Sequence, residues 1–238
     1  MKDSNSARQR YRPMMSEESA QRLRERHEQV VAAGRRTEVI TVTHLGREFV
    51  VPPEVYAPSP LGLAELVLHE VRDADRVLDM GTGSGVNGII AAAKSRDVVA
   101  VDVNPIAVEC AKQNAEMNGV AARLDIRESD LFENVPGRFD LIIFDPPFRW
   151  FRPQDLYERG MADENYESLT QFFFQVKGYL VRGGRILLAF GTTGDIGYLR
   201  HLISQAGFDA EELRRAGGEA DGYSIAFRLK EAVGGIQT

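Results

Sequence analysis

A glycine-rich turn follows a short apolar stretch within residues 77–89, VLDMGTGSGVNGI. Gly81, Gly83 and Gly85 alternate in this turn, and Asp79 stands before them. Glycine at the first two positions lets the backbone turn tightly and approach a ligand that a Cβ atom would keep away. The helix expected behind the turn offers unpaired backbone N–H groups at its N-terminus. The spacing alone also fits a loop that needs only positive φ angles, so the surrounding residues must decide between the two interpretations.

A second acidic residue, Asp102, ends the next apolar stretch, VVAVD, about 20 residues after the first glycine. A carboxylate at this place accepts hydrogen bonds from the ribose hydroxyls of a nucleoside cofactor. Asp79 would repel a pyrophosphate but would attract a cationic group. The pattern G-x-G-x-G also differs from the G-x-G-x-x-G of dinucleotide sites. These features favour S-adenosyl-L-methionine, whose methionine end carries positive charge, over a nicotinamide cofactor.

The segment FDLIIFDPPF, residues 139–148, predicts the reacting centre. Asp145 ends an apolar strand, at the edge where an open parallel sheet holds its ligands. Pro146 and Pro147 fix φ twice and stiffen the loop, and Phe148 offers a flat surface. Hydrogen-bond acceptors on Asp145 and the Pro146 carbonyl would orient the N–H bonds of a planar nitrogen, while the ring stacks on its π-system. The expected gain is positioning of this nitrogen for in-line methyl transfer.

Four motifs in this order resemble those of the Rossmann-type (class I) S-adenosylmethionine-dependent methyltransferases, from about Val55 to Leu229. They are the glycine turn, the acid ending the second strand, the stretch from Ser129 to Phe132, and the Asp-Pro-Pro-Phe motif of amino-methyltransferases. The resemblance implies a cofactor site made of Asp79, Gly81, Thr82, Gly83, Gly85, Asp102, Val103, Asp130, Leu131 and Phe132. In it, Asp130 would accept from the adenine amino group, with Leu131 or Phe132 beside the ring. Asp130 could equally cap a helix or a turn.

Within these enzymes, the motif resembles that of the group containing release-factor glutamine methyltransferases and small-ribosomal-subunit guanine methyltransferases, with Asp145 where asparagine is usual. Val55-Tyr56 followed by Pro58 resembles the opening of the eukaryotic and archaeal glutamine-methylating branch. The acidic continuation of that branch is replaced by Ser59-Pro60-Leu61. The acceptor therefore stays open among a protein amide, a nucleic-acid base and a small metabolite. A different class also stays open, a catalytically silent cofactor-binding module that activates a partner subunit.

Arg149, Trp150, Phe151 and Arg152 directly follow the Asp-Pro-Pro-Phe motif. Aromatic residues interleaved with arginines could stack on a base and hold a phosphate, or line a pocket for an acidic small molecule. Arg149 and Trp150 are therefore candidate substrate residues. The alternative is a lid in which Trp150 and Phe151 pack on the core while the arginines are solvated.

Strands that alternate with helices predict the scaffold that positions these residues, a doubly wound, mostly parallel seven-stranded sheet. The last two strands are joined by a turn too short for a helical crossover, so the final strand should run antiparallel. The expected strands are 76–80, 98–102, 122–129, 139–145, 185–191, 208–216 and 222–229, and the expected helices are 60–72, 85–95, 104–119, 166–181 and 195–207. The turns at Gly183-Gly184 and at 217–222 would separate the late elements.

Residues 1–54 predict an N-terminal extension of a disordered arm, a helix beginning near Ser16 and a β-hairpin, ahead of a methyltransferase domain at 55–238. Residues 1–36 carry a net charge of +4, which leaves −10 on the rest of the chain. The acidic domain disfavours an extended nucleic-acid footprint, whereas the basic arm favours a limited contact.

The composition, with 43% hydrophobic and 27% charged residues, is that of a soluble globular protein without a membrane span. A single cysteine, Cys110, excludes a disulfide framework, and four scattered histidines predict no metal site. The first fifteen residues lack the apolar stretch of a secretory signal, so a cytoplasmic location is expected.

Overall fold

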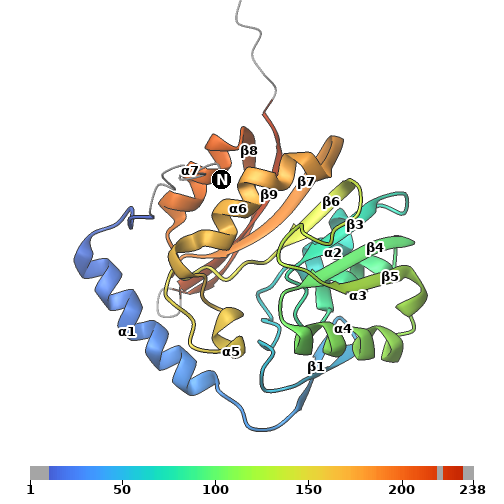
Figure 1. Cartoon of the computed structure of the whole chain (residues 1–238), viewed down its shortest axis with the longest axis horizontal. Coiled ribbons are helices and arrows are strands. Elements are labelled where there is room, and N and C mark those ends of the chain that lie inside the picture. Colours follow the sequence, from blue (N-terminus) through green and yellow to red (C-terminus); the bar gives the residue numbers. More distant parts are fainter. Residues whose placement is uncertain (1–10, 219–221, 233–238) are drawn as a thin grey trace, which may run out of the picture.

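The computed structural model describes residues 11–218 and 222–232, and Figure 1 shows a twisted central sheet with helices on both faces. The sheet has the strand order β5-β4-β3-β6-β7-β9-β8. Strands β3 to β7 pair in parallel, whereas β9 runs antiparallel to both β7 and β8. The strands are β3 (Arg76–Met80), β4 (Asp97–Asp102), β5 (Leu124–Glu128), β6 (Phe139–Phe144), β7 (Leu180–Gly191), β8 (Phe208–Gly218) and β9 (Gly222–Glu231). This topology confirms the predicted fold class, although residues 219–221 of the last turn lie outside the described residues.

Two hydrophobic cores, one on each face of the sheet, follow from the alternation of side chains along its strands. The helices that cover these faces are α2 (Ala64–Glu70), α3 (Val86–Ala92), α4 (Pro105–Met117), α5 (Leu156–Arg159), α6 (Glu167–Gln175) and α7 (Ile196–Gln205), with short 3-10 turns at Ala121–Arg123, Glu164–Tyr166 and Val176–Tyr179. In β3, Leu78 and Met80 pack into the core under α6 and α7, whereas Val77 packs into the core under α2, α3 and α4. Asp79 shares the face of Val77, which directs its carboxylate toward α3.

The predicted hairpin is present as β1 (Ile40–His44) and β2 (Arg47–Val51) and packs against α4. Phe49 and Val51 are fully buried in the same core as α2 and α3. Asn114 of α4 accepts a hydrogen bond from the Val50 N–H at 2.9 Å and donates to the Val50 and Ser84 carbonyls at 2.9 Å. One buried amide thus joins the hairpin to the glycine turn.

Helix α1 (Glu17–Gly34) begins at Ser16, whose side chain accepts from the Ser19 N–H, and runs along the outside of the molecule in Figure 1. The expectation of a disordered arm ahead of this helix is wrong for residues 11–15. Tyr11 is buried and donates a hydrogen bond to Asp195 at 2.9 Å, and Met14 N–H donates to the same carboxylate at 2.6 Å. Residues 1–10 lie outside the described residues.

The predicted start of a strand at Arg185, after a turn at Gly183 and Gly184, is wrong, because β7 already begins at Leu180. Both glycines lie inside β7, whose register shifts between the Phe139–Leu180 and Leu141–Arg185 pairs. Gly183 takes up the irregularity with a φ of 79°.

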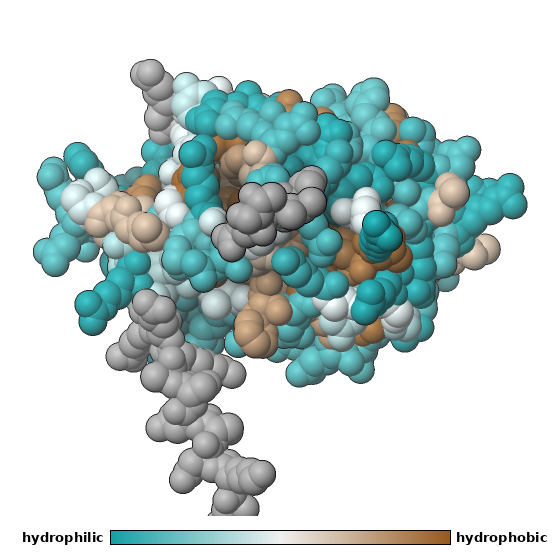
Figure 2. Space-filling view, turned by 90° about the horizontal axis from the view of Figure 1, so that it is seen from above, coloured by the Kyte–Doolittle hydropathy of each residue, from teal (hydrophilic) through white to brown (hydrophobic). Residues whose placement is uncertain are grey.

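Seen from above in Figure 2, the surface is mainly hydrophilic, with hydrophobic residues in small areas. Within the described ranges, no helix is long and apolar enough to cross a membrane.

Candidate active site

A cavity of about 980 Å³ opens at the carboxyl ends of β3, β4 and β6. Its wall also includes parts of α1 and of the linker between the hairpin and α2. The predicted site residues that line it are Gly81, Thr82, Gly83, Asp102, Val103, Asp130, Leu131, Asp145, Pro146, Pro147, Phe148 and Arg149. Asp79, Gly85, Phe132 and Trp150 do not line it. The topology therefore gathers segments from four separate stretches of the chain around one hollow.

The glycines of the turn divide into two kinds by what surrounds them. All three have positive φ angles, 69° at Gly81, 56° at Gly83 and 88° at Gly85. A Cβ at Gly81 or Gly83 would meet no protein atom within 4 Å, because both face the open cavity. A Cβ at Gly85 would lie 3.1 Å from the Ala111 Cβ of α4. The first two glycines thus leave room for a ligand, and the third lets two helices approach each other.

Asp79 holds the turn together from beneath. Its Oδ2 accepts hydrogen bonds from the Thr82 hydroxyl at 2.6 Å and the Gly88 N–H at 2.8 Å, while its buried Oδ1 has no partner among the described residues. Burial raises the pKa of Asp79 to about 7, against the lowering effect of these two bonds. Gly88 was missed by the sequence analysis. A Cβ at Gly88 would lie 3.1 Å from Asp79 Oδ2. The sequence indicates this position only by a glycine three residues after Gly85, inside an expected helix.

Asp102 faces the cavity from the end of β4. Its Oδ2 accepts from the Gly83 N–H at 2.8 Å and its Oδ1 from the Asn104 N–H at 2.9 Å. Burial raises the pKa of Asp102, and these backbone bonds and the charge of Arg159 oppose the rise. The turn and the residues after β4 therefore hold the carboxylate in place at the wall of the cavity.

The stretch after β5 splits between the cavity and the core. Asp130 is exposed and Leu131 is half-buried, and both line the cavity. Phe132 is buried and stacks on Tyr179 with ring centroids 4.2 Å apart, so it belongs to the core between the sheet and helices α6 and α7. Of the two hydrophobic residues predicted beside an adenine ring, only Leu131 lies at the cavity.

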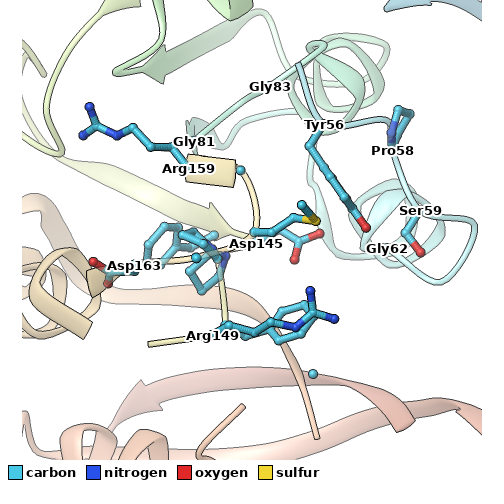
Figure 3. Close-up of a pocket in the computed structure, with 18 of the residues that line it drawn as sticks. Tyr56, Pro58, Ser59, Gly62, Gly81, Gly83, Asp145, Arg149, Arg159 and Asp163 are labelled. Atoms are coloured by element: carbon cyan, nitrogen blue, oxygen red, sulfur yellow. The ribbon is translucent and has the colours of Figure 1, made fainter. Parts of the chain in front are cut away.

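Asp145 lies directly after β6, and in Figure 3 its carboxylate points toward Tyr56 and Gly62. The Asp145 side chain is exposed to the cavity, but protein atoms surround the cavity itself. The resulting loss of solvent contact raises the pKa of Asp145 to about 6, although the charge of Arg214 opposes the rise. Above this pH the group is an ionised hydrogen-bond acceptor beside the Pro146 carbonyl.

Phe148 is fixed by elements that the sequence analysis did not connect with it. The Tyr166 hydroxyl donates to the Phe148 carbonyl at 2.7 Å and accepts from the Asp195 N–H at 2.8 Å. A Cβ at Gly191, the end of β7, would lie 2.6 Å from the Phe148 ring. Tyr166 is fully buried and, like Asn165, has a left-handed backbone, with φ angles of 53° and 55°. These distant residues could not be paired with the motif from spacing alone.

The segment after Phe148 has the buried aromatic residues of the lid interpretation and an arginine at the cavity, as in the substrate-binding interpretation. Trp150 and Phe151 are buried with ring centroids 4.8 Å apart, and Trp150 packs against Tyr11 and Tyr166 in the core. Arg149 is buried at the cavity wall, with only 8% of its surface exposed, which differs from the solvated arginine of the lid interpretation.

The linker before α2 was not predicted to line the site. Glu54, Tyr56, Ser59 and Gly62 all border the cavity. Arg214 of β8 donates to the carbonyls of Leu61, at 2.8 Å, and of Gly62, and so holds this linker over Asp145. The only signal in the sequence was the similarity of Val55-Tyr56 to a family opening.

The fold and this site define a class I methyltransferase. Open space over Gly81 and Gly83, and the fixed carboxylate of Asp102 at the same cavity, fit S-adenosyl-L-methionine as the methyl donor. Residues 48–193 match the family described as methyltransferase small domain. This match covers more than half of the chain, and the chain belongs to that family of S-adenosylmethionine-dependent enzymes.

Relatives of this chain include enzymes that act on glutamine. A Methanocaldococcus jannaschii protein, named as a protein N5-glutamine methyltransferase, is 37% identical over 152 residues, or 60% of this chain and 76% of the relative. The release factor glutamine methyltransferase of Cereibacter sphaeroides is 40% identical over 164 residues, or 61% of this chain and 57% of the relative. The match spans less than half of the ribosomal protein L11 methyltransferases of two other bacteria.

The fold also matches solved structures. A ribosomal protein L11 methylase from Lactobacillus delbrueckii subsp. bulgaricus superimposes with a TM-score of 0.57 at 19% identity, covering 76% of this chain and 84% of that one. The likeness supports the Rossmann-like methyltransferase fold.

Proposed function

We propose that the protein transfers a methyl group from S-adenosyl-L-methionine to the side-chain amide nitrogen (N5) of a glutamine in a protein acceptor. The observation that carries this proposal is the Asp-Pro-Pro-Phe motif at the cavity, with an open carboxylate on Asp145 and a fixed Phe148. Relatives named for glutamine N5 methylation support the choice of an amide.

In this proposal the cofactor residues act by position and charge. Asp102 accepts hydrogen bonds from the ribose hydroxyls, and Gly81 and Gly83 leave room for the methionyl part. Asp130 and Leu131 contact the adenine. Asp79 stabilises the turn through its hydrogen bonds with Thr82 and Gly88. When bound, S-adenosylmethionine supplies an electrophilic methyl group on its sulfonium.

The acceptor residues orient a poor nucleophile. The amide N–H bonds donate to the Asp145 carboxylate and the Pro146 carbonyl, and the amide plane stacks on Phe148. This arrangement aims the nitrogen at the methyl group, and positioning supplies the catalytic gain. The new N–C bond forms as the S–C bond breaks, and the nitrogen then loses its proton to Asp145 or to water.

The test uses a carbon-13-labelled methyl donor and a blocked glutamine peptide. Nuclear magnetic resonance of the product should show the methyl group on nitrogen. Asp145→Asn should retain more activity than Asp145→Ala, because the amide oxygen still accepts a hydrogen bond. Asp125→Asn, at an exposed carboxylate paired with Arg127, is the matched control and should be fully active.

A methyl group on oxygen or carbon, or wild-type activity in Asp145→Ala, would overturn this function. Parallel assays with fractionated RNA and small metabolites decide the acceptor class, since strong nitrogen methylation of either with none of the peptide would replace glutamine. Absence of transfer to every acceptor by a protein that binds S-adenosylhomocysteine would favour the silent cofactor-binding module.

A further inference from the structure

We infer that Arg149 forms an acceptor subsite for a single carboxylate group next to the methylated amide. This inference rests on the proposed function and narrows it to acceptors that carry a negative charge close to the amide. Arg185, a buried arginine of β7, is paired with Asp75 at 2.7 Å, and Arg149 differs from it in its charged neighbours.

Arg149 is a buried cation that has no acidic partner in the part of the chain that the structure describes. In the ranges 11–218 and 222–232, no carboxylate oxygen lies within 4.0 Å of its guanidinium, and its polar side-chain contact is His27 Nδ1 at 3.4 Å from Nη1. Burial and the charge of Arg149 lower the pKa of His27, so the imidazole is neutral and Nδ1 accepts. A neutral acceptor offsets little of the cost of burying a guanidinium, because buried charges in proteins are normally paired.

The acidic residues around Arg149 are engaged elsewhere. The Asp163 carboxylate accepts from the backbone N–H groups of Ser168 at 3.0 Å and Leu169 at 2.9 Å, at the start of α6. Glu158 pairs with Arg35 at 2.7 Å and accepts from the Gln154 N–H at 2.7 Å. These bonds hold both carboxylates in fixed structural roles, which leaves the charge of Arg149 available to a ligand.

The position of Arg149 places that ligand beside the reacting centre. Its guanidinium carbon lies 5.3 Å from the centroid of the Phe148 ring, and both residues line the same cavity as Asp145. In Figure 3, Asp145 is seen between the glycine turn and Arg149. A guanidinium presents a planar fork of N–H donors that matches the two oxygens of a carboxylate.

The rest of the cavity favours one negative charge over a polyanion. Among the described residues, seven acidic ones line the cavity against four arginines, so its wall carries more negative than positive side chains and would repel a string of phosphates. The carboxylate could belong to an acidic residue flanking the glutamine in a peptide, or it could be the main-chain carboxylate of a small amide. Both sources share the same chemistry at Arg149.

Calorimetric titration of the protein saturated with S-adenosylhomocysteine tests the subsite without turnover. Acetyl-Glu-Gln-amide carries a side-chain carboxylate and N-acetylglutamine a main-chain carboxylate, with acetyl-Gln-Gln-amide and N-acetylglutaminamide as their neutral counterparts. At least one carboxylate probe should bind the wild type about tenfold more tightly than its neutral counterpart, because a hydrogen bond between charged groups contributes a binding free energy of that size. The probe with the larger difference identifies the source of the carboxylate.

Variants distinguish a specific carboxylate subsite at Arg149 from a general effect of positive charge near the cavity. Arg149→Gln should lose this tenfold preference and bind the neutral probes as the wild type does, and Arg149→Lys should keep part of the preference. Arg152→Gln removes the same charge from the same segment, where the side chain is 78% exposed and lies 3.8 Å from Glu164. This matched control should keep the full preference.

Equal affinity of the wild type for carboxylate and neutral probes, or no binding of either carboxylate, would overturn the subsite. An equal loss in Arg152→Gln would also overturn it, as would an RNA oligonucleotide that binds wild type and not Arg149→Gln. These binding results are independent of the atom that is methylated. Nitrogen methylation of a glutamine peptide without carboxylate preference would leave the proposed function standing while this inference fails.

Discussion

Replacing Tyr166 with phenylalanine should disturb the acceptor side of the site from a distance. The variant Tyr166→Phe keeps the ring and the left-handed backbone but removes a hydroxyl that bonds Phe148 O and Asp195 N. Each buried polar group left without a partner costs about 1–3 kcal/mol. The two groups together should lower the free energy of unfolding by roughly 2–6 kcal/mol, which a domain of average stability, with about 10 kcal/mol within the usual range of about 5–15 kcal/mol, survives.

Urea unfolding followed by circular dichroism measures this loss, and kinetics measure its effect on the site. We expect a higher acceptor KM with unchanged affinity for S-adenosylhomocysteine, because Tyr166 contacts Phe148 and lies away from the glycine turn. Tyr198→Phe is the matched control, since its hydroxyl makes one partly buried bond, with Thr170 at 3.0 Å. An equal loss of stability in both variants, or an unchanged acceptor KM in Tyr166→Phe, would refute Tyr166 as a positioning residue.

Three further predictions concern the turn and the acceptor platform. Asp102→Ala should bind S-adenosylhomocysteine about tenfold more weakly or worse, and unchanged affinity in a calorimetric titration of the folded variant would contradict its role at the ribose. Because burial raises the pKa of Asp79 to about 7, the folded protein binds a proton more tightly than the unfolded chain. The free energy of unfolding without cofactor should therefore fall as pH rises from about 4 to about 7, and an equally steep fall in Asp79→Asn would count against it. Gly191→Ala should displace the ring of Phe148 and reduce activity on the acceptor, whereas Gly178→Ala, with open space around it, should be nearly neutral; similar activities of the two variants would argue against this packing.

The sequence determined the fold class and the edge of the sheet where the site lies. Parallel strands end at one edge, so Asp79, Asp102 and Asp145, each at or near the end of an apolar stretch, had to come together there. The turn glycines also followed from spacing, because positive φ angles and close approach are local requirements. Local chemistry of this kind is written in consecutive residues and needs no knowledge of distant contacts.

Only the tertiary structure decided which neighbours of these residues face the cavity. Leu131 lines the hollow and Phe132 the core, and Arg149 is at the wall while Trp150 is inside, although each pair is adjacent in the sequence. Tyr11 is buried because its partner Asp195 lies 184 residues away. The burial of a side chain depends on what packs against it from other elements, and these contacts, far apart along the chain, leave no periodic signal in the residues themselves.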